Sequence, residues 1–450
     1  MGNYYSKNPF DQSLIAEFDL DSPQILESKV LKASAYKPLK LNNRINKVLA
    51  LAAYLQENRK SLAQSISLEV AKPIKESRAE IDKCIKLCHY YADSAEEILK
   101  TEELDIDGSK AYRSYEPLGI VLGIMPWNFP FWQVFRFAVP TILAGNSILL
   151  KHAPNCQLCA ESILEAFNLA GFSDSTYQNI RLENEAIATL IADDRIQAIS
   201  LTGSTKAGKE VAQKAAFSLK PQVLELGGSN AFILHHSASV SKAAALAAQA
   251  RLMNAGQSCI AAKRFLVPRT MELAFLEALK EEFSSFKMGD PMLEETDLGP
   301  MARMDLKEKA LLQMQESMEL GAKLVLGGGG EGLFLEATIL SEVKPDMPVF
   351  KEEVFAPIAA VCLYDTWEEA IDLSNKSSFG LGVSLIGDDE SFLMDQASYF
   401  KEGAVFINEL VKSDPRLPFG GIKQSGYGRE LGPEGLRAFT NLKTIYRAKR

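Results

Sequence analysis

Apolar residues in the N-terminal part of the chain recur at helical spacing. Between about residues 40 and 101, Leu, Ala and Ile alternate with Glu and Lys about every 3.6 positions, as in INKVLALAAYLQENRKSLAQSI. This spacing lines one face of a helix, so the region is predicted to be helical. The pattern changes at DIDGSKAYRSYEPLGIVLGIMPWNFP, where Asp-Gly and Pro-Leu-Gly interrupt β-prone runs. These signals indicate a hairpin followed by a buried strand.

Helical and β-prone segments then alternate along the chain. A helix, a Gly-Asn turn and an apolar strand fit AVPTILAGNSILLKHAP, QLCAESILEAFNLAG is a further helix, and strands are expected near 179–182 and 196–202. The alternation restarts near Gly228, and the C-terminal NLKTIYRAKR has the alternating apolar positions of a strand. Strands that alternate with helices indicate βαβ units, so the predicted fold class is α/β with mostly parallel sheets.

Length and charge narrow the class of protein. A chain of 450 residues exceeds what one hydrophobic core normally supports, so two or more domains are expected. The formal net charge of -9 argues against nucleic acid as a partner, because phosphate contacts need clustered Lys and Arg. No apolar run approaches the ~18 residues of a membrane span, and the N-terminus lacks the features of a secretory signal. We therefore expect no membrane partner.

Cysteine usage favours a reducing compartment. Six cysteines in so long a chain do not make a disulfide framework, so a cytoplasmic location is the simplest expectation. Cys156 and Cys159 have the spacing of a metal-ligand pair, but a zinc site needs a second pair. The candidate second pair, Cys84 and Cys88, lies in a helical pattern without a knuckle, so no metal site is predicted.

Three polar residues lie at element boundaries, where functional sites are usually built. Cys259 follows the turn-like run 254–258, Glu225 interrupts an apolar strand just before a glycine pair, and Asn128 lies in MPWNFP. Each also has a structural interpretation. A buried cysteine is usually a small hydrophobe, the carboxylate could point outward from an edge strand, and Asn before Phe-Pro is often a turn residue.

The motifs PWNFP, LTGS, LELGG, GQSC, EEVFAP and PFGGIKQSGYGRE favour the functional interpretation. Over nearly its whole length the chain resembles the aldehyde dehydrogenase superfamily, which carries these motifs in this order and spacing. Within it, WNFPFWQVFR, LLKHAPN and CIAAKRF are most similar to succinate-semialdehyde dehydrogenases. One departure concerns Ala261, which stands where some relatives carry a second cysteine.

The resemblance implies an aldehyde dehydrogenase-like fold with three parts. These are a Rossmann-like NAD(P)-binding domain (1–104 and 117–226), an α/β catalytic domain (227–423), and a small β element for oligomerisation (105–116 and 438–450). A C-terminal strand of this kind offers an unpaired edge, which favours a homodimer or homotetramer.

The resemblance also implies a mechanism. Cys259 attacks the aldehyde to give a thiohemiacetal, and the oxyanion is held by the amide of Asn128 and the backbone N–H of Cys259. Hydride transfer leaves a thioester, and Glu225 acts as the general base for its hydrolysis. Cysteine suits this role because it is the side chain most readily made nucleophilic near neutral pH.

A coenzyme site is expected at the start of the helix STKAGKEVAQKAA, whose free N–H donors can meet a pyrophosphate. Lys151 follows an apolar strand, where ligands of open α/β sheets bind. The coenzyme-binding residues implied by the resemblance are Met125, Trp127, Lys151, Pro154, Gly203, Ser204, Gly208, Leu226, Glu353 and Phe355.

Coenzyme choice is predicted from Pro154. Relatives often carry a Glu at this position, and its carboxylate repels the 2′-phosphate of NADP. Here Pro154 removes that repulsion, while the cationic Lys151 remains to attract a phosphate. NADP is therefore expected to be favoured, with NAD still usable.

Substrate choice is assigned by the resemblance to Arg136 and Arg264, with Ser413 beside them. An arginine fork suits a carboxylate because two N–H donors match two oxygens, although either arginine could instead make a structural ion pair. The expected substrate is succinate semialdehyde. The alternatives are another aliphatic or carboxylated aldehyde, such as glutarate semialdehyde, or a catalytically silent paralogue. A cysteine hydrolase is disfavoured because the four histidines fit no base motif.

Overall fold

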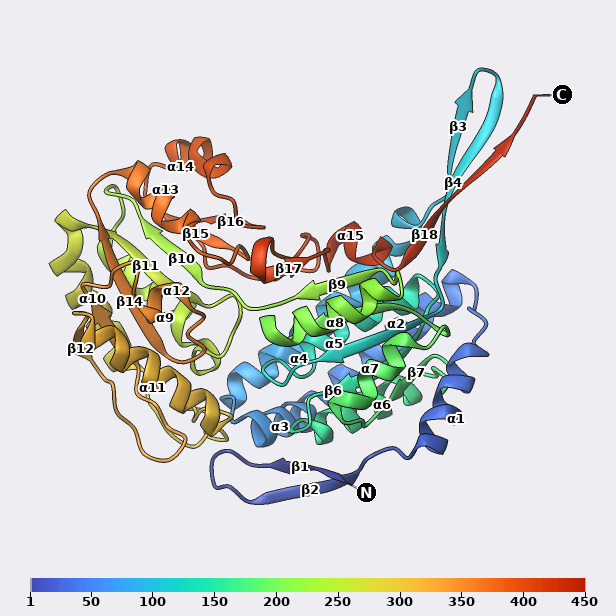
Figure 1. Cartoon of the computed structure of the whole chain (residues 1–450), viewed down its shortest axis with the longest axis horizontal. Helices are drawn as coiled ribbons and strands as arrows, with labels where there is room; N and C mark the ends of the chain where they lie inside the picture. Colours follow the sequence, from blue (N-terminus) through green and yellow to red (C-terminus); the bar gives the residue numbers. More distant parts are fainter. Residues whose placement is uncertain (1, 450) are drawn as a thin grey trace.

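The computed structural model describes residues 2–449, in which two large sheets lie side by side (Figure 1). Both sheets are parallel except for one edge strand, and helices flank them. A three-stranded antiparallel sheet and an N-terminal hairpin complete the fold. The predicted α/β class is confirmed.

The first sheet has the strand order β17-β9-β8-β5-β6-β7. Its strands are short apolar runs that are buried almost throughout, as expected for parallel strands covered on both faces. Their bounds are β5 (Ile120–Met125), β6 (Ser147–His152), β7 (Tyr177–Asn179), β8 (Ile196–Thr202), β9 (Gln222–Glu225) and β17 (Gly426–Tyr427). The helices that alternate with them are α5 (Trp132–Leu143), α6 (Gln157–Leu169), α7 (Asn184–Ala192) and α8 (Thr205–Phe217).

The predicted helical region before this sheet divides into three helices, which follow α1 (Pro23–Ser34). They are α2 (Leu41–Glu57), α3 (Arg59–Val70) and α4 (Ile74–Ile98). Helix α3 ends because Ala71 adopts φ 57°, a left-handed conformation, and Pro73 cannot continue the helix. The long helix α4 then packs against α2 and α5.

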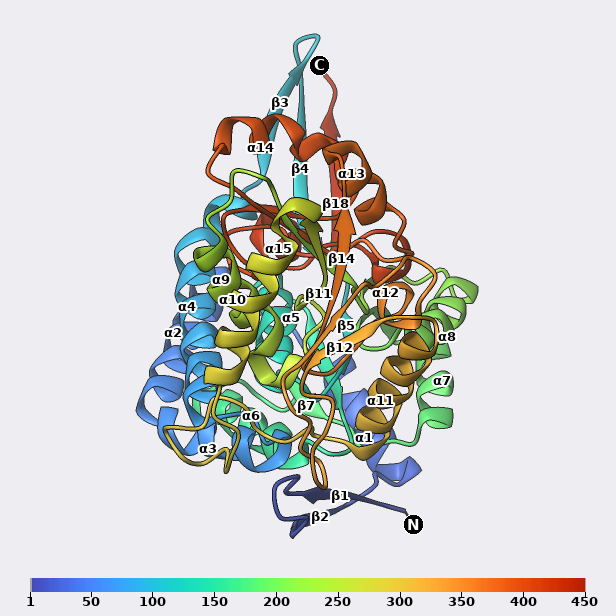
Figure 2. The ribbon, with the colours of Figure 1, turned by 90° about the vertical axis from the view of Figure 1, so that its left-hand side faces the viewer.

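The second sheet has the order β12-β13-β14-β11-β10-β15-β16. Helices α9 and α10 cover one face, and α11 lies on the other side (Figure 2). The strands are β10 (Asn230–Leu234), β11 (Ala262–Pro268), β12 (Lys323–Leu326), β13 (Thr338–Ser341), β14 (Ile358–Tyr364), β15 (Val383–Ile386) and β16 (Val405–Ile407). The helices are α9 (Val240–Leu252), α10 (Glu272–Ser285), α11 (Met304–Glu319), α12 (Pro348–Lys351), α13 (Trp367–Asn375) and α14 (Glu390–Gln396).

The C-terminal segment returns from the second sheet to the first. It adds β17 beside β9, forms α15 (Gly432–Arg437), and ends in β18 (Thr440–Arg447). Strand β18 pairs with β4 (Ser109–Pro117), which pairs with β3 (Glu102–Ile106) in a sheet that projects from the body (Figure 1). The predicted hairpin and C-terminal strand are therefore present. The division into three domains stays a proposal.

The N-terminal hairpin was not expected from the sequence. Strands β1 (Asn3–Lys7) and β2 (Leu14–Asp19) pair beside α3 and α6 (Figure 1). The hydroxyl of Ser6 donates to the buried carboxylate of Glu69, which also accepts the N–H groups of Leu158 and Cys159 at the start of α6. The hairpin is thus anchored through a helix N-terminus.

Candidate active site

Cys259 lies where two cavities meet. The larger cavity, of about 400 Å³, runs along the ends of β5, β6 and β8, and the smaller one, of about 90 Å³, lies between α5, α9 and the segment 410–419. Among residues 2–449, only Cys259 and Gln133 line both cavities. A nucleophile at this junction can face a large ligand on one side and a small one on the other.

The larger cavity brings together the three predicted catalytic residues, Asn128, Glu225 and Cys259. It also gathers most of the predicted coenzyme residues, namely Met125, Trp127, Lys151, Pro154, Gly203, Ser204, Leu226, Glu353 and Phe355. Gly208 does not line it. A Cβ there would come within 2.5 Å of the Leu226 side chain, so Gly208 lets α8 approach the sheet closely.

The two predicted arginines are separated by the structure. Arg136 lines the smaller cavity together with Ser413, whereas Arg264 lines neither cavity. The Nε of Arg264 donates to the carbonyl of Ser229, and one terminal nitrogen donates to the carbonyls of Leu373 and Ser374 at the end of α13. This guanidinium stabilises the C-terminus of a helix. The expectation that Arg264 binds the substrate carboxylate is corrected accordingly.

A strained turn precedes Cys259, the predicted nucleophile. After α9, Asn254, Ala255 and Gly256 have φ values of 52°, 51° and 69°, a left-handed conformation that costs a non-glycine residue about 1 kcal/mol or more. Arg251 holds the turn by donating to the carbonyls of Gly256 at 2.7 Å and Ala262 at 2.8 Å. These buried hydrogen bonds offset the strain, so the position of the following Cys259 is fixed.

The amide of Asn128 is oriented for an oxyanion. Its Oδ1 accepts a hydrogen bond from Gln133 at 3.1 Å, and its Nδ2 donates to the carbonyl of Gln257 at 3.0 Å. An amide nitrogen carries two hydrogens, so one donor of Asn128 remains for a ligand. The predicted oxyanion role therefore has a defined donor, with Gln133 setting its orientation.

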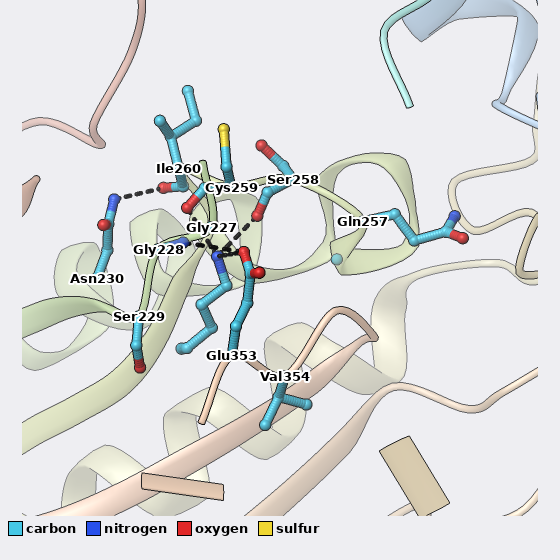
Figure 3. Close-up of polar contacts among 12 residues, drawn as sticks. Gly227, Gly228, Ser229, Asn230, Gln257, Ser258, Cys259, Ile260, Glu353 and Val354 are labelled. Atoms are coloured by element: carbon cyan, nitrogen blue, oxygen red, sulfur yellow. Dashed lines mark hydrogen bonds and ion pairs between the residues drawn. The ribbon is translucent and has the colours of Figure 1, made fainter. Parts of the chain in front are cut away.

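Burial raises the pKa of the Cys259 thiol to about 11, and the positive charges of Lys263 and Arg136 act against this rise. Lys263 donates to the carbonyls of Ser258 at 2.8 Å and Cys259 at 2.7 Å, and its Nζ lies 3.5 Å from Glu353 Oε1. The same carboxylate accepts the N–H of Gly228, and Figure 3 shows it beside the backbone of the nucleophile. Lys263 thus links the predicted coenzyme contact to the thiol.

Glu225 is buried without a hydrogen-bond partner for either carboxyl oxygen within residues 2–449. Burial raises the pKa of Glu225 well above its usual range, and the negative charge of Glu430 adds to the rise. Arg136 forms a buried ion pair with Glu430 and donates to Thr202 at 3.3 Å. Burial and the charge of Glu430 therefore favour the protonated form of the Glu225 carboxyl.

Helix α4 contributes three site residues that the sequence reasoning missed. Glu76 accepts the N–H of Asn254 at 2.8 Å, Glu80 accepts the N–H groups of Phe131 and Trp132 at 2.9 Å each, and Lys83 lines the smaller cavity. Glu76, Glu80 and Lys83 follow the spacing i, i+4, i+7, which places them on one helix face. This spacing of charged residues is visible in the sequence, but it is also typical of a helix face that is exposed to solvent.

The four other buried cysteines near the first sheet do not form a metal site. Within residues 2–449, no group of three His, Cys, Asp or Glu side chains could hold a metal ion. Burial raises the thiol pKa of Cys156 and Cys159 well above the usual range.

Within residues 2–449, no helix has the length and apolar character needed to cross a membrane.

Comparison with known proteins identifies the family of this chain. The sequence profile of the Aldehyde dehydrogenase family matches residues 2–445. A probable succinate-semialdehyde dehydrogenase [NADP(+)] of Synechocystis sp. is 44% identical over 88% of both chains. The succinate semialdehyde dehydrogenase [NAD(P)+] Sad of Escherichia coli is 41% identical over 92% of this chain and 90% of its own.

Solved structures of related enzymes share the fold over nearly the whole chain. Succinic semialdehyde dehydrogenase from Streptococcus pyogenes, in complex with NADP+, superposes with a TM-score of 0.97 at 33% identity, covering 99% of this chain and 100% of its own. The chain belongs to the aldehyde dehydrogenase family. It is an NAD(P)-dependent aldehyde dehydrogenase.

We predict that Lys263→Met slows alkylation of Cys259. Loss of the largest opposing positive charge raises the thiol pKa further, and each unit of pKa lowers the thiolate fraction about tenfold at a given pH. Iodoacetamide labelling rates between pH 7 and 10, followed by mass spectrometry of the Cys259 peptide, measure the shift. Lys263→Arg keeps the charge and is the matched control. Superimposable pH profiles for Lys263→Met and wild type would contradict the prediction.

Proposed function

We propose that this enzyme oxidises succinate semialdehyde to succinate with NAD(P)+. The observation that carries the proposal is the position of Cys259 between the larger cavity and a small cavity lined by Arg136, Lys83 and Ser413. A small cavity with cationic walls suits a short aldehyde that carries a carboxylate. Relatives that cover most of the chain are named succinate-semialdehyde dehydrogenases, which supports the same substrate.

The larger cavity fits a dinucleotide at its helix terminus. Ser204 caps α8 by accepting the N–H of Ala207 at 3.2 Å, which leaves other N–H groups of the first turn for a pyrophosphate. Lys151 at the end of β6 would meet the adenosine ribose, and Glu353 and Phe355 would meet the nicotinamide half. When bound, the coenzyme supplies the hydride acceptor.

In the proposed mechanism, the thiolate form of Cys259 attacks the aldehyde carbon and forms the oxyanion of a thiohemiacetal. The free hydrogen of the Asn128 amide and the backbone N–H of Cys259 stabilise the oxyanion, and one such donor is typically worth about 3 kcal/mol of barrier. Loss of hydride leaves a thioester on Cys259. Glu225 then takes a proton from water, which attacks the thioester and releases succinate.

Another carboxylated aldehyde, such as glutarate semialdehyde, is the alternative substrate within the same chemistry. A silent paralogue is disfavoured because Cys259, Glu225 and Asn128 are all present and line one cavity. We further propose a cytoplasmic homodimer or homotetramer. The projecting sheet supports assembly, because β18 and β3 are its unpaired edges.

We propose that NADP is preferred to NAD. Pro154 and Lys151 line the cavity at the expected adenosine end, so a 2′-phosphate would meet a cation and no carboxylate at position 154. Burial lowers the pKa of Lys151, and the charge of Glu183 acts against this fall, as the negative charge of a bound 2′-phosphate also would. Several relatives are named for NADP(+), which supports the preference.

The substrate proposal predicts a large preference for a carboxylated aldehyde. We expect kcat/KM for succinate semialdehyde to exceed that for butanal about 30-fold or more, the size typical of a desolvated charge contact. Steady-state assays of coenzyme reduction with both aldehydes and with glutarate semialdehyde measure this. Equal values for succinate semialdehyde and butanal would refute the substrate assignment, whereas a higher value for glutarate semialdehyde would move it to the longer acid.

We expect Glu225→Gln to form the thioester but fail to hydrolyse it. Stopped-flow absorbance should show one burst of reduced coenzyme followed by a stall. Because the pKa of Glu225 is raised, the base form accumulates as pH increases, so wild-type deacylation should accelerate above neutral pH and this rise should vanish in Glu225→Gln. Cys259→Ala, which cannot form the thioester, is the control without a burst. A missing burst in Glu225→Gln would assign Glu225 to an earlier step.

Coenzyme choice is tested at Pro154. Wild type should have the higher kcat/KM with NADP, and Pro154→Glu should shift the ratio toward NAD about tenfold or more, because like charges in contact cost several kcal/mol. Pro154→Gln changes the backbone in the same way without adding charge and is the matched control. A wild-type enzyme tenfold better with NAD, or an equal shift in both variants, would defeat the assignment.

A further inference from the structure

Because Arg264 does not line the smaller cavity, a carboxylate bound there would need another cation. Lys83 extends from α4 into the wall that also contains Ser413, Arg136 and Cys259. We propose that Lys83, together with Ser413, holds the carboxylate at the far end of the aldehyde substrate and so determines substrate specificity. The inference deepens the proposed function and rests on it.

The hydrogen bonds around Ser413 favour an anion. Its hydroxyl oxygen accepts from Lys83 Nζ at 2.6 Å and from the indole N–H of Trp132 at 3.0 Å. Both lone pairs of the hydroxyl are then occupied, so its own hydrogen must be donated elsewhere. The ammonium of Lys83 has three hydrogens and uses one of them on Ser413. Lys83 and Ser413 therefore present an ammonium donor and a hydroxyl donor to one ligand.

Lys83 has no counter-ion within residues 2–449. No carboxylate of the described chain lies within 4.0 Å of its Nζ, which instead lies 4.1 Å from the centre of the Trp132 ring. A desolvated cation without a partner is costly, so the site is complementary to an incoming carboxylate.

The neighbouring charges are already paired with other groups. Glu80, one turn earlier on α4, is bonded to Lys72 and to the start of α5, and Arg136 on α5 is paired with Glu430. On the loop that carries Ser413, Asp414 accepts from Arg416 and lies 3.5 Å from Lys86, and Lys412 pairs with Glu409. Lys83 is thus the cation of this wall that can accept a substrate anion without breaking an ion pair.

The pairing also gives the specificity a pH dependence. Burial, followed by the charge of Arg136, lowers the pKa of Lys83 to about 7, while Cys84, Glu80 and Asp414 act against the fall. A lysine is charged below its pKa, so the free enzyme loses the ammonium as pH rises above 7. The kcat/KM ratio of succinate semialdehyde to butanal should therefore fall between pH 6.5 and 9. Titrations of Cys259 and Glu225 affect both aldehydes and cancel in this ratio.

The test compares Lys83→Met, Lys83→Arg and Lys86→Met on succinate semialdehyde and butanal. We expect Lys83→Met to lose about 30-fold or more in kcat/KM for succinate semialdehyde, as for truncation of one partner of a buried charge pair, and to change less than about threefold on butanal. Lys83→Arg should retain much of the preference and lose its pH dependence, because arginine stays charged. Lys86→Met removes the same charge one turn along α4 and should leave the ratio unchanged.

Inhibition by succinate gives a second readout that does not depend on turnover. Its Ki should rise in Lys83→Met and not in Lys86→Met, while melting temperatures show whether the variants are folded. If wild type prefers succinate semialdehyde and Lys83→Met keeps that preference, the role of Lys83 is overturned and the proposed function stands. If wild type shows no preference at all, the proposed function fails first.

Discussion

The buried carboxylate of Glu80 is the contact on which the active site depends. It pairs with Lys72 and accepts two backbone N–H groups at the start of α5, where the helix dipole favours a negative charge. Removing one partner of such a buried pair typically costs roughly 3–5 kcal/mol. Helix α5 follows directly after Asn128 and carries Gln133 and Arg136. The positions of Asn128, of Gln133, which orients its amide, and of Arg136 therefore all depend on one helix N-terminus.

The same helix face reaches the nucleophile turn through Glu76 and the substrate wall through Lys83. Three segments that are far apart in the sequence thus meet along two turns of α4. Each of these segments is hydrogen-bonded to a side chain of α4, so the helix fixes their relative positions. In this arrangement α4 touches no reacting atom but sets the distances between the groups that do.

Electrostatically, the site combines two acids whose protonated forms are favoured by burial with cations nearby. Burial raises the pKa of both Cys259 and Glu225, whereas the positive charges of Lys263 and Arg136 act against the rise at Cys259. Lys263 is paired with Glu353, a predicted coenzyme contact. Any ligand that engages the Glu353 carboxylate would leave more of the lysine charge directed at the thiol. If Glu353 contacts the coenzyme as we propose, coenzyme binding and the ionisation of Cys259 are connected through Lys263.

The sequence predicted the parts of this protein that depend on local pattern. Strand β8 was expected at its observed bounds. Cys259, Glu225 and Asn128 were singled out because each occupies a motif at an element boundary, and the structure brings all three to one cavity. Arg264 was misplaced because successive residues of a strand face opposite sides of the sheet, so Lys263 points to the site and Arg264 to α13. Lys83 and Glu80 could not be found, since their partners lie 330 and about 50 positions away and a charged helical stripe usually faces solvent. The N-terminal hairpin was missed because its strands are short and partly exposed.

A thiol with a pKa of about 11 has a consequence for the lifetime of the enzyme. Burial disfavours the thiolate of Cys259, which is the form that peroxides attack. Ala261 provides no neighbouring sulfur that could trap a sulfenic acid as a disulfide. Protection of Cys259 from oxidants thus comes from the burial that suppresses its ionisation, and any change that raises the thiolate fraction also makes the sulfur more open to oxidation.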